Sequence, residues 1–240
     1  MILIFDLGNT RIKWWQIENG HVISGGIAEY DNELAFLETL SGVYERVLIS
    51  SVRIAEFNDF FAQVAARHFS KAPEWATSQY KFKNLTNGYK DFSALGVDRW
   101  LGMIGVSSCH PANFILVSIG TAVTLDVVVD GIHLGGFIGP GKNAFLNALG
   151  QSTDGVQVKP NSGQGYSLAT TTTAAVNHAF LCMLSGMLQK TEAEVEKVLP
   201  VFVTGGDGEL IFRIRPNACF LPQLMLKGIC AYFNEPLIEE

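Results

Sequence analysis

The chain has 240 residues, 48% of them hydrophobic and 17% charged, and its formal net charge is −6. That composition excludes an intrinsically disordered chain. No apolar run approaches the ~18 residues of a membrane-spanning helix. Lys and Arg are few and scattered, which argues against a nucleic-acid partner. The first residues lack the basic segment of a signal peptide, and none of the four cysteines forms a CxxC pair, so we expect reduced thiols, mostly buried, in a cytoplasmic protein.

The first half of the chain predicts strands followed by helices. Asn19-Gly20 lies between two short β-rich runs, which is a strong hairpin signal. A later apolar run is followed by apolar residues at helical spacing. The proline after His110 is expected to end the second helix. The expected elements are strands 2–6, 12–17, 21–27 and 46–51, a helix around 57–65, a loop over 85–96 and a helix over 98–109.

The second half begins with the same order of elements. A buried strand is expected over 114–119, and two strands then flank the turn Asp130-Gly131. Thr191 and Glu194 form a capping-box pattern, which predicts a separate short helix. The expected elements are strands 123–129, 133–138, 199–204 and 218–221, and helices 142–149, 172–188, 192–199 and 222–233.

The two halves resemble each other residue by residue. Gly8 aligns with Gly120, and Asn19-Gly20 with Asp130-Gly131, at a spacing one residue shorter. Chance similarity of two apolar hairpins is the alternative, but glycines match in register at several places. The repeat unit is too long for a solenoid and suits a small domain. We therefore expect two tandem α/β domains, residues 1–112 and 113–240.

The repeated turn suits a phosphate. Asp6-Leu7-Gly8-Asn9-Thr10 places a carboxylate, a glycine and hydrogen-bond donors where one strand turns into the next. Backbone N–H groups in such a turn can hold an anion, and a strand-end carboxylate can hold Mg²⁺ through water. Neither a Walker A loop nor a Rossmann fingerprint is present. A plain hairpin is the alternative reading, but a matching turn at Gly120-Thr121 favours a two-sided clamp.

Two further segments admit a functional and a structural interpretation. Gly205-Gly206 follows an apolar strand and could bind a flat adenine against its exposed backbone, or it could be a simple strand-to-helix turn. Asp98, in Gly96-Val97-Asp98-Arg99, could be a general base beside an arginine that holds a carboxylate or phosphate. The tetrapeptide alone favours an Asp98 helix cap. Trp100 continues into an apolar helix and is expected in the core.

Together these residues resemble the type III pantothenate kinases, within the superfamily of actin, heat-shock chaperones and sugar kinases. The resemblance covers nearly the whole chain and implies a duplicated ribonuclease-H-like fold with mixed five-stranded sheets and a nucleotide site in the cleft between the domains. The motifs that carry it are Asp6-x-Gly8-Asn9-Thr10, Gly96-x-Asp98-Arg99, Gly120-Thr121-Ala122-x-Thr124-x-Asp126, Gly135-Gly136-x-Ile138-x-Pro140-Gly141 and Thr204-Gly205-Gly206-Asp207.

The resemblance implies transfer of the ATP γ-phosphate to the primary hydroxyl of pantothenate, the first step towards coenzyme A. It also implies a homodimer with pantothenate at the subunit interface. Asp98 would take the hydroxyl proton, and Asp6 would orient Mg²⁺. ATP would be bound by Asp6, Leu7, Gly8, Asn9, Thr10, Arg11, Ile12, Lys13, Thr121, Gly205 and Gly206. Pantothenate would be held by Tyr89, Gly96, Val97, Asp98, Arg99 and Thr172, the last chosen from the run Thr170 to Thr173.

One departure from the family pattern concerns a cation. The family usually has an acid at the position of Ser118, the repeat partner of Asp6, where it helps to bind an activating potassium or ammonium ion. A neutral hydroxyl supplies no charge, so we expect a weaker or altered monovalent-cation requirement.

Two alternatives of other classes remain at this point. One is a non-catalytic regulatory protein, like those named Bvg accessory factors. The other is a kinase or phosphatase for another small molecule, because a fold does not fix a substrate.

Overall fold

The computed structural model describes residues 1–30, 34–110, 112–152 and 165–238. The chain forms two compact units, Met1–His110 with Gln223–Glu240, and Pro111–Pro222. This division differs from the expected one, 1–112 and 113–240, because the last helix belongs to the first unit. None of the helices in the described ranges is long and apolar enough to cross a bilayer.

The first unit is built on a mixed five-stranded sheet with the order β3-β2-β1-β4-β5. β1 pairs antiparallel with β2 and parallel with β4. The strands are β1 (Ile2–Leu7), β2 (Arg11–Glu18), β3 (His21–Glu29), β4 (Arg46–Ser51) and β5 (Glu74–Trp75), and a small pair is formed by β6 (Lys81–Phe82) and β7 (Leu85–Thr86). The helices are α1 (Ala55–Phe69), α2 (Val97–Cys109), α5 (Leu224–Phe233) and two short 3-10 segments, η1 (Ala35–Thr39) and η2 (Phe92–Ala94).

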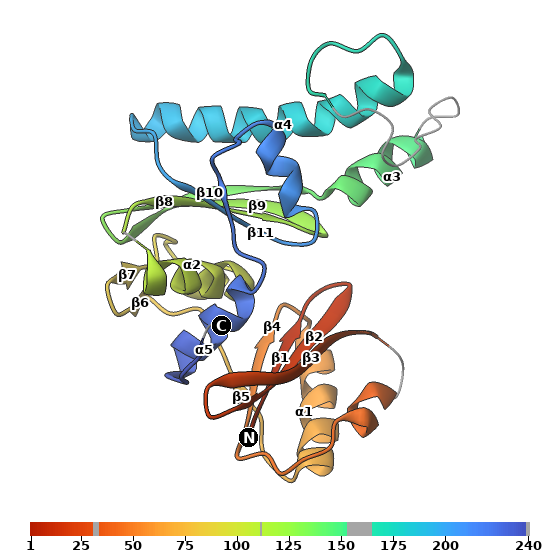
Figure 1. The fold of residues 1–240 in the computed structure, drawn as a ribbon, viewed down its shortest axis with the longest axis vertical. Helices are drawn as coiled ribbons and strands as arrows, with labels where there is room; N and C mark the ends of the chain where they lie inside the picture. The colour runs from red at the N-terminus through yellow and green to blue at the C-terminus, as the bar shows by residue number, and fades with distance from the viewer. Residues whose placement is uncertain (31–33, 111, 153–164, 239–240) are drawn as a thin grey trace. The chain divides into compact units, whose positions relative to one another are not determined.

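The second unit has strands in the corresponding order, β10-β9-β8-β11-β12. They are β8 (Phe114–Ile119), β9 (Ala122–Val129), β10 (Ile132–Pro140), β11 (Val201–Thr204) and β12 (Cys219–Phe220). Its helices are α3 (Lys142–Ser152), α4 (Thr172–Val195) and the 3-10 segment η3 (Gly208–Arg213). Figure 1 shows α3 and α4 on one face of this sheet, where Phe180 and Leu184 of α4 pack against the core strands.

The predicted repeat is therefore present in three dimensions. The first three strands have 6, 8 and 9 residues in the first unit and again 6, 8 and 9 in the second. Asn19-Gly20 and Asp130-Gly131 adopt the same left-handed backbone, with φ of 50° and 83° in one turn and 51° and 75° in the other. The residue missing from the second copy lies in the predicted phosphate turn, Gly8-Asn9-Thr10 against Gly120-Thr121.

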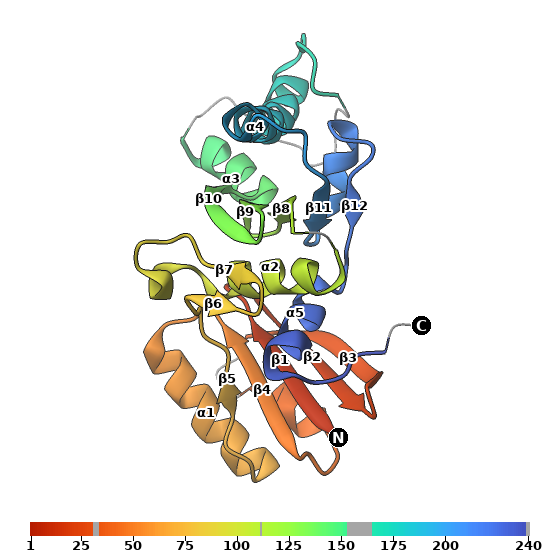
Figure 2. The ribbon, with the colours of Figure 1, turned by 90° about the vertical axis from the view of Figure 1, so that its left-hand side faces the viewer.

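Close packing between helices explains the placement of α5. α1 covers one face of the first sheet through Phe61 and Ala65, while α2 and α5 contact β4 and pack against each other (Figure 2). A Cβ atom on Gly228 of α5 would lie 2.1 Å from the Leu101 carbonyl oxygen of α2. Such close approach needs glycine, and it joins the two helices in one core.

Two sequence predictions about local structure are wrong. The separate helix 192–199 does not exist: α4 runs on to Val195, and Thr191 is buried within it rather than capping a new helix. No glycine or proline interrupts residues 189–195, so nothing stops the helix there. Cysteine burial also differs, since Cys230 alone of the four is buried. Trp100, by contrast, is fully buried in the core as predicted.

Candidate functional site

Asp6 lies near the carboxyl end of β1, between two polar residues on the neighbouring strands. It pairs with Lys13 on β2 and with Ser50 on β4. The pKa of Asp6 is raised to about 6, mainly by burial and also by the Asp98 carboxylate, while Lys13 and the Ser50 hydroxyl oppose the rise. Asp98 is thus close enough to Asp6 for their charges to interact, although they are far apart in sequence.

The turn after Asp6 exposes the groups expected to meet phosphate. Asn9, Thr10 and Arg11 are exposed, and the Gly8 N–H donates to the Arg11 carbonyl oxygen at 3.1 Å. A Cβ on Gly8 would lie 3.1 Å from that oxygen, which leaves little room for a side chain. Leu7 and Ile12 are fully buried in the first unit's core. Of the predicted run, these two can therefore offer only backbone atoms to a ligand.

Asp98 stands in the first turn of α2 and does not cap the helix. Gly96 occupies the N-cap position, and no side chain caps it there. The Asp98 Oδ1 atom accepts a hydrogen bond from the Arg99 N–H at 2.8 Å. A Cβ on Gly96 would lie 2.7 Å from that Oδ1. Glycine at position 96 therefore leaves room for the carboxylate.

Arg99 and Tyr89, both predicted to hold substrate, are brought together. Arg99 is only 6% exposed, and its Nη1 donates to the Tyr89 hydroxyl oxygen at 2.7 Å. Asn87 fixes this arrangement: its amide donates to the carbonyls of Gln79 and Phe92, and its Oδ1 accepts from the Tyr89 N–H. A guanidinium is a side chain whose planar donors match a carboxylate.

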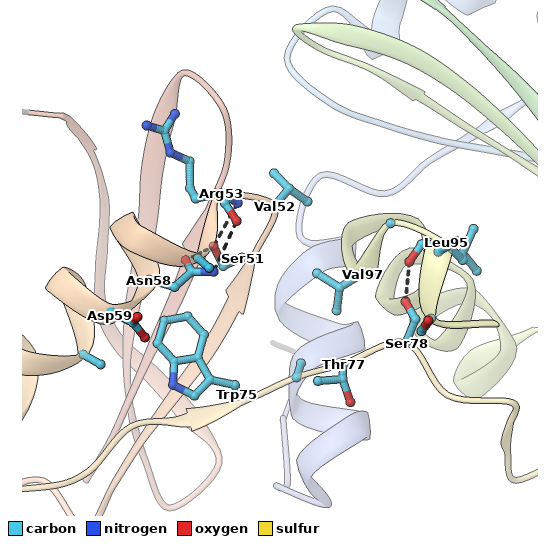
Figure 3. Close-up of a pocket in the computed structure, with 16 residues that line it drawn as sticks. Ser51, Val52, Arg53, Asn58, Asp59, Trp75, Thr77, Ser78, Leu95 and Val97 are labelled. Atoms are coloured by element: carbon cyan, nitrogen blue, oxygen red, sulfur yellow. Dashed lines mark hydrogen bonds between the residues drawn. The ribbon is translucent and has the colours of Figure 1, made fainter. Parts of the chain in front are cut away.

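A cavity of about 650 Å³ lies beside the start of α2. Its walls are the end of β4, the first turns of α1, the segment after β5, and residues 93–97, so it shares Gly96 and Val97 with the predicted substrate residues. Figure 3 shows Trp75 and Asp59 on one side and Val97 and Leu95 on the other. Ser78 on its wall donates to the Leu95 carbonyl oxygen at 2.7 Å. This volume suits a small organic molecule.

The donor set at Asp6 fits a magnesium ion that is shared with a nucleotide. Within the described residues, no group of three or more His, Cys, Asp or Glu side chains could hold a metal. Mg²⁺ commonly binds proteins through one or two carboxylates and completes its shell with phosphate oxygens and water. A carboxylate whose pKa is raised by burial and by a second carboxylate would be stabilised in its charged form by a cation.

The second unit presents the corresponding turn and a glycine loop. Thr121 is exposed in the turn after β8, and its carbonyl oxygen accepts from the Gly141 N–H at 3.1 Å. Ser118, at the position equivalent to Asp6, pairs with Thr204 of β11. Gly205 has a φ of 97°, and a Cβ there would lie 2.2 Å from the Ile119 carbonyl oxygen, whereas Gly206 has open space beside it.

Two neighbouring threonines at the start of α4 differ in their surroundings. The Thr171 hydroxyl oxygen caps the helix by accepting from the Ala174 N–H at 3.3 Å. Thr172 is the first residue of α4 and is exposed. The Thr171 hydroxyl therefore has a structural role, whereas the role of Thr172 in binding stays a prediction.

Three residues beside the site were missed by sequence reasoning. Ser50 lies next to Asp6, Arg53 follows β4, and Tyr30 follows β3. A signal was available for two of them, because Ser50 and Arg53 stand at the end of a buried strand parallel to β1, where ligand-binding residues of such sheets gather. Tyr30 gave no signal, since its partner lies 22 residues away in the chain.

Comparison with known proteins identifies the family of this chain. Residues 2–194 match the family model described as type III pantothenate kinase. The chain belongs to the type III pantothenate kinase family. A type III pantothenate kinase of Cellvibrio japonicus is 38% identical, over 98% of this chain and 97% of its own. One of Pseudomonas fluorescens is 31% identical, over 95% and 97%.

Solved structures show the same fold at low sequence identity. A Baf family protein of Campylobacter jejuni, described as a candidate transcriptional activator, superposes with a TM-score of 0.63 at 18% identity, over 97% of both chains. A candidate 2-dehydro-3-deoxygalactonokinase of Sinorhizobium meliloti gives 0.60 at 12% identity, over 97% and 98%. These likenesses concern the fold alone, and they agree with the predicted two-domain α/β architecture. The family makes this chain a phosphotransferase and does not favour the regulatory alternative.

Proposed function

We propose that this pantothenate kinase transfers the γ-phosphate of ATP to pantothenate with Asp98 as the general base. The observation that carries the proposal is the pair of carboxylates, Asp98 in the first turn of α2 and Asp6 at the end of β1, whose charges interact. The Arg99–Tyr89 pair and the cavity beside Gly96 adjoin the same turn of α2.

Pantothenate would be held by the residues around that turn. Its carboxylate suits the buried Arg99 guanidinium and the Tyr89 hydroxyl, and its chain suits the cavity beside Gly96 and Val97. An ionised Asp98 can accept the hydroxyl proton as the phosphoryl group arrives. Phosphoryl transfer passes through a loose transition state, so positioning and charge stabilisation account for most of the catalysis.

The nucleotide would be bound by the residues that the family resemblance assigns to ATP. The exposed run from Asn9 to Arg11, with Lys13, would meet the phosphates of ATP, and Thr121 would contribute from the second turn. Gly205 and Gly206 would lie against the base. Asp6 would hold Mg²⁺, which, when bound, offsets the negative charge of the phosphates.

The monovalent cation is expected to matter less here than its role in the family implies. Ser118 is partly exposed and can coordinate potassium or ammonium only through a neutral oxygen. The protein would act as a homodimer in the cytoplasm. The exposed Thr172 would contribute to pantothenate binding.

The test is Asp98→Asn, compared with Asp130→Asn, which changes an exposed aspartate in a hairpin turn of the second unit. Asp98→Asn should lose most turnover, by about 10²–10⁴-fold, while ATP still binds. Asp130→Asn should keep its turnover. Near-normal turnover of Asp98→Asn would rule out the general-base role. A panel of other small alcohols as acceptors would reveal a different substrate on the same fold.

A further inference from the structure

Two side chains from outside the predicted phosphate turn hold its carbonyl groups. The Tyr30 hydroxyl donates to the Gly8 carbonyl oxygen at 2.5 Å. Arg53 Nη1 donates to the Asn9 carbonyl oxygen at 3.0 Å. These are consecutive carbonyls of the turn, and their donors follow β3 and β4 respectively. The backbone of the turn is thus fixed by residues distant in sequence.

Arg53 and Tyr30 also support each other. The Arg53 guanidinium carbon lies 4.7 Å from the centre of the Tyr30 ring and 4.9 Å from that of Phe57, and the two rings stand nearly perpendicular, with centres 5.2 Å apart. The Arg53 main chain is held as well: its N–H donates to the Ser51 hydroxyl oxygen, and its carbonyl accepts from the Asn58 amide. Figure 3 shows the guanidinium pointing away from the cavity.

Holding these carbonyls orients the N–H groups of the turn. A planar trans peptide directs its carbonyl and the following N–H to opposite sides. Because the Gly8 and Asn9 carbonyls face Tyr30 and Arg53, the N–H groups of Asn9 and Thr10 face the other way. A concave row of N–H groups binds an anion, and carbonyl oxygens on the same side would repel it.

Arg53 also brings a charge that the described residues do not neutralise. No carboxylate within them forms an ion pair with Arg53, and its buried Nε has no hydrogen-bond acceptor there. A cation behind the turn, bonded to one of its carbonyls, makes the potential on the opposite side more favourable for an anion.

We propose that Arg53 and Tyr30 are positioning residues that hold the Gly8–Thr10 turn in its phosphate-binding conformation. They contact the turn and not the nucleotide, and Arg53 adds electrostatic attraction for the phosphates. This inference rests on the proposed function, in which the turn binds the phosphates of ATP.

The test separates ATP from pantothenate. Tyr30→Phe removes only the hydroxyl, Arg53→Lys keeps the charge without the planar guanidinium, and Arg53→Ala removes both. Arg46→Ala is the matched control, because Arg46, at the start of the same strand β4, pairs with Glu74 and lies apart from the turn. Titration calorimetry with a non-hydrolysable ATP analogue gives Kd, and steady-state kinetics give KM for both substrates.

The expected loss follows from the hydrogen bonds removed. Arg53→Ala should weaken the ATP analogue about tenfold or more, Tyr30→Phe by about three- to tenfold, and Arg53→Lys by an intermediate factor. Arg53 also lines the cavity proposed for pantothenate, but its guanidinium points away from that cavity, so KM for pantothenate should change much less than Kd for the ATP analogue in all three variants. The double variant should lose less than the product of the single losses, because both residues act through one turn.

Three outcomes would overturn the proposal. One is unchanged binding of the analogue by Tyr30→Phe, the variant least able to disturb folding. The second is an equal rise in KM for both substrates, with a lowered Tm, in the Arg53 and Tyr30 variants. That result would indicate a purely structural role, and Arg46→Ala shows how large such a general effect is when an arginine of the same strand is lost. The third is a wild-type protein that binds no ATP, which would overturn the proposed function as well. In the first two outcomes the wild type binds ATP, so the proposed function would stand.

Discussion

Replacing Asp6 with asparagine should make the ligand-free protein more stable at neutral pH. Burial and the Asp98 carboxylate raise the pKa of Asp6 from 3.8 to about 6. Between these two values the unfolded chain has released the proton while the folded protein keeps it. The free energy of unfolding therefore falls as pH rises, and the full loss is present above pH 6. Asparagine does not ionise and avoids this loss.

The size of the effect follows from the shift. About two pKa units, at 1.36 kcal/mol each, give about 3 kcal/mol at pH 7 and about 0.5 kcal/mol at pH 4. Urea unfolding of Asp6→Asn and the wild type at several pH values measures the difference, and Asp130→Asn controls for the loss of an exposed aspartate. Asp6→Asn should gain about 2–3 kcal/mol over the wild type between pH 4 and 7. Mg²⁺ with ATP should stabilise the wild type more than the variant.

A difference between Asp6→Asn and the wild type that does not change with pH would refute the reasoning. So would a wild type that gains stability over the variant as pH rises, because that is the behaviour of a carboxylate whose pKa is lowered by folding.

Three further changes have distinct expected results. Ser118→Asp should increase the ratio of activity in potassium to that in sodium, whereas a strict, tight potassium dependence of the wild type would contradict the charge argument. Gly228→Ala should cost about 1–3 kcal/mol of unfolding free energy in urea, because its Cβ would meet the Leu101 carbonyl at 2.1 Å; an unchanged midpoint would show that α2 and α5 can separate freely. Asn87→Ala should raise KM for pantothenate about fivefold or more and leave KM for ATP unchanged, because it frees the loop that carries Tyr89; equal changes in both would show a general loosening instead.

The repeat was predictable because its signals are local. Asn-Gly and Asp-Gly turns between alternating strands are strong hairpin patterns, and both adopt the expected left-handed backbone. The same holds for α2, where an apolar helical pattern is ended by Pro111. Strands β5, β6 and β7 have two residues each, too few for any periodicity to appear.

What could not be predicted depends on contacts between distant parts of the chain. Asp98 looks like a cap from its tetrapeptide, and only the helix start at Val97 places it inside the first turn. The unit to which α5 belongs is decided by its glycine contact with α2. The hydrogen bond from Arg53 to the Asn9 carbonyl joins residues that are 44 positions apart, so no local sequence pattern predicts it.

The most direct measurement is the release of ADP from ATP by the wild-type enzyme, with and without pantothenate. If the chain phosphorylates pantothenate, ADP release should depend on pantothenate and match the phosphorylated product mole for mole. Steady ADP release at the same rate without pantothenate would contradict that reaction and indicate hydrolysis of ATP.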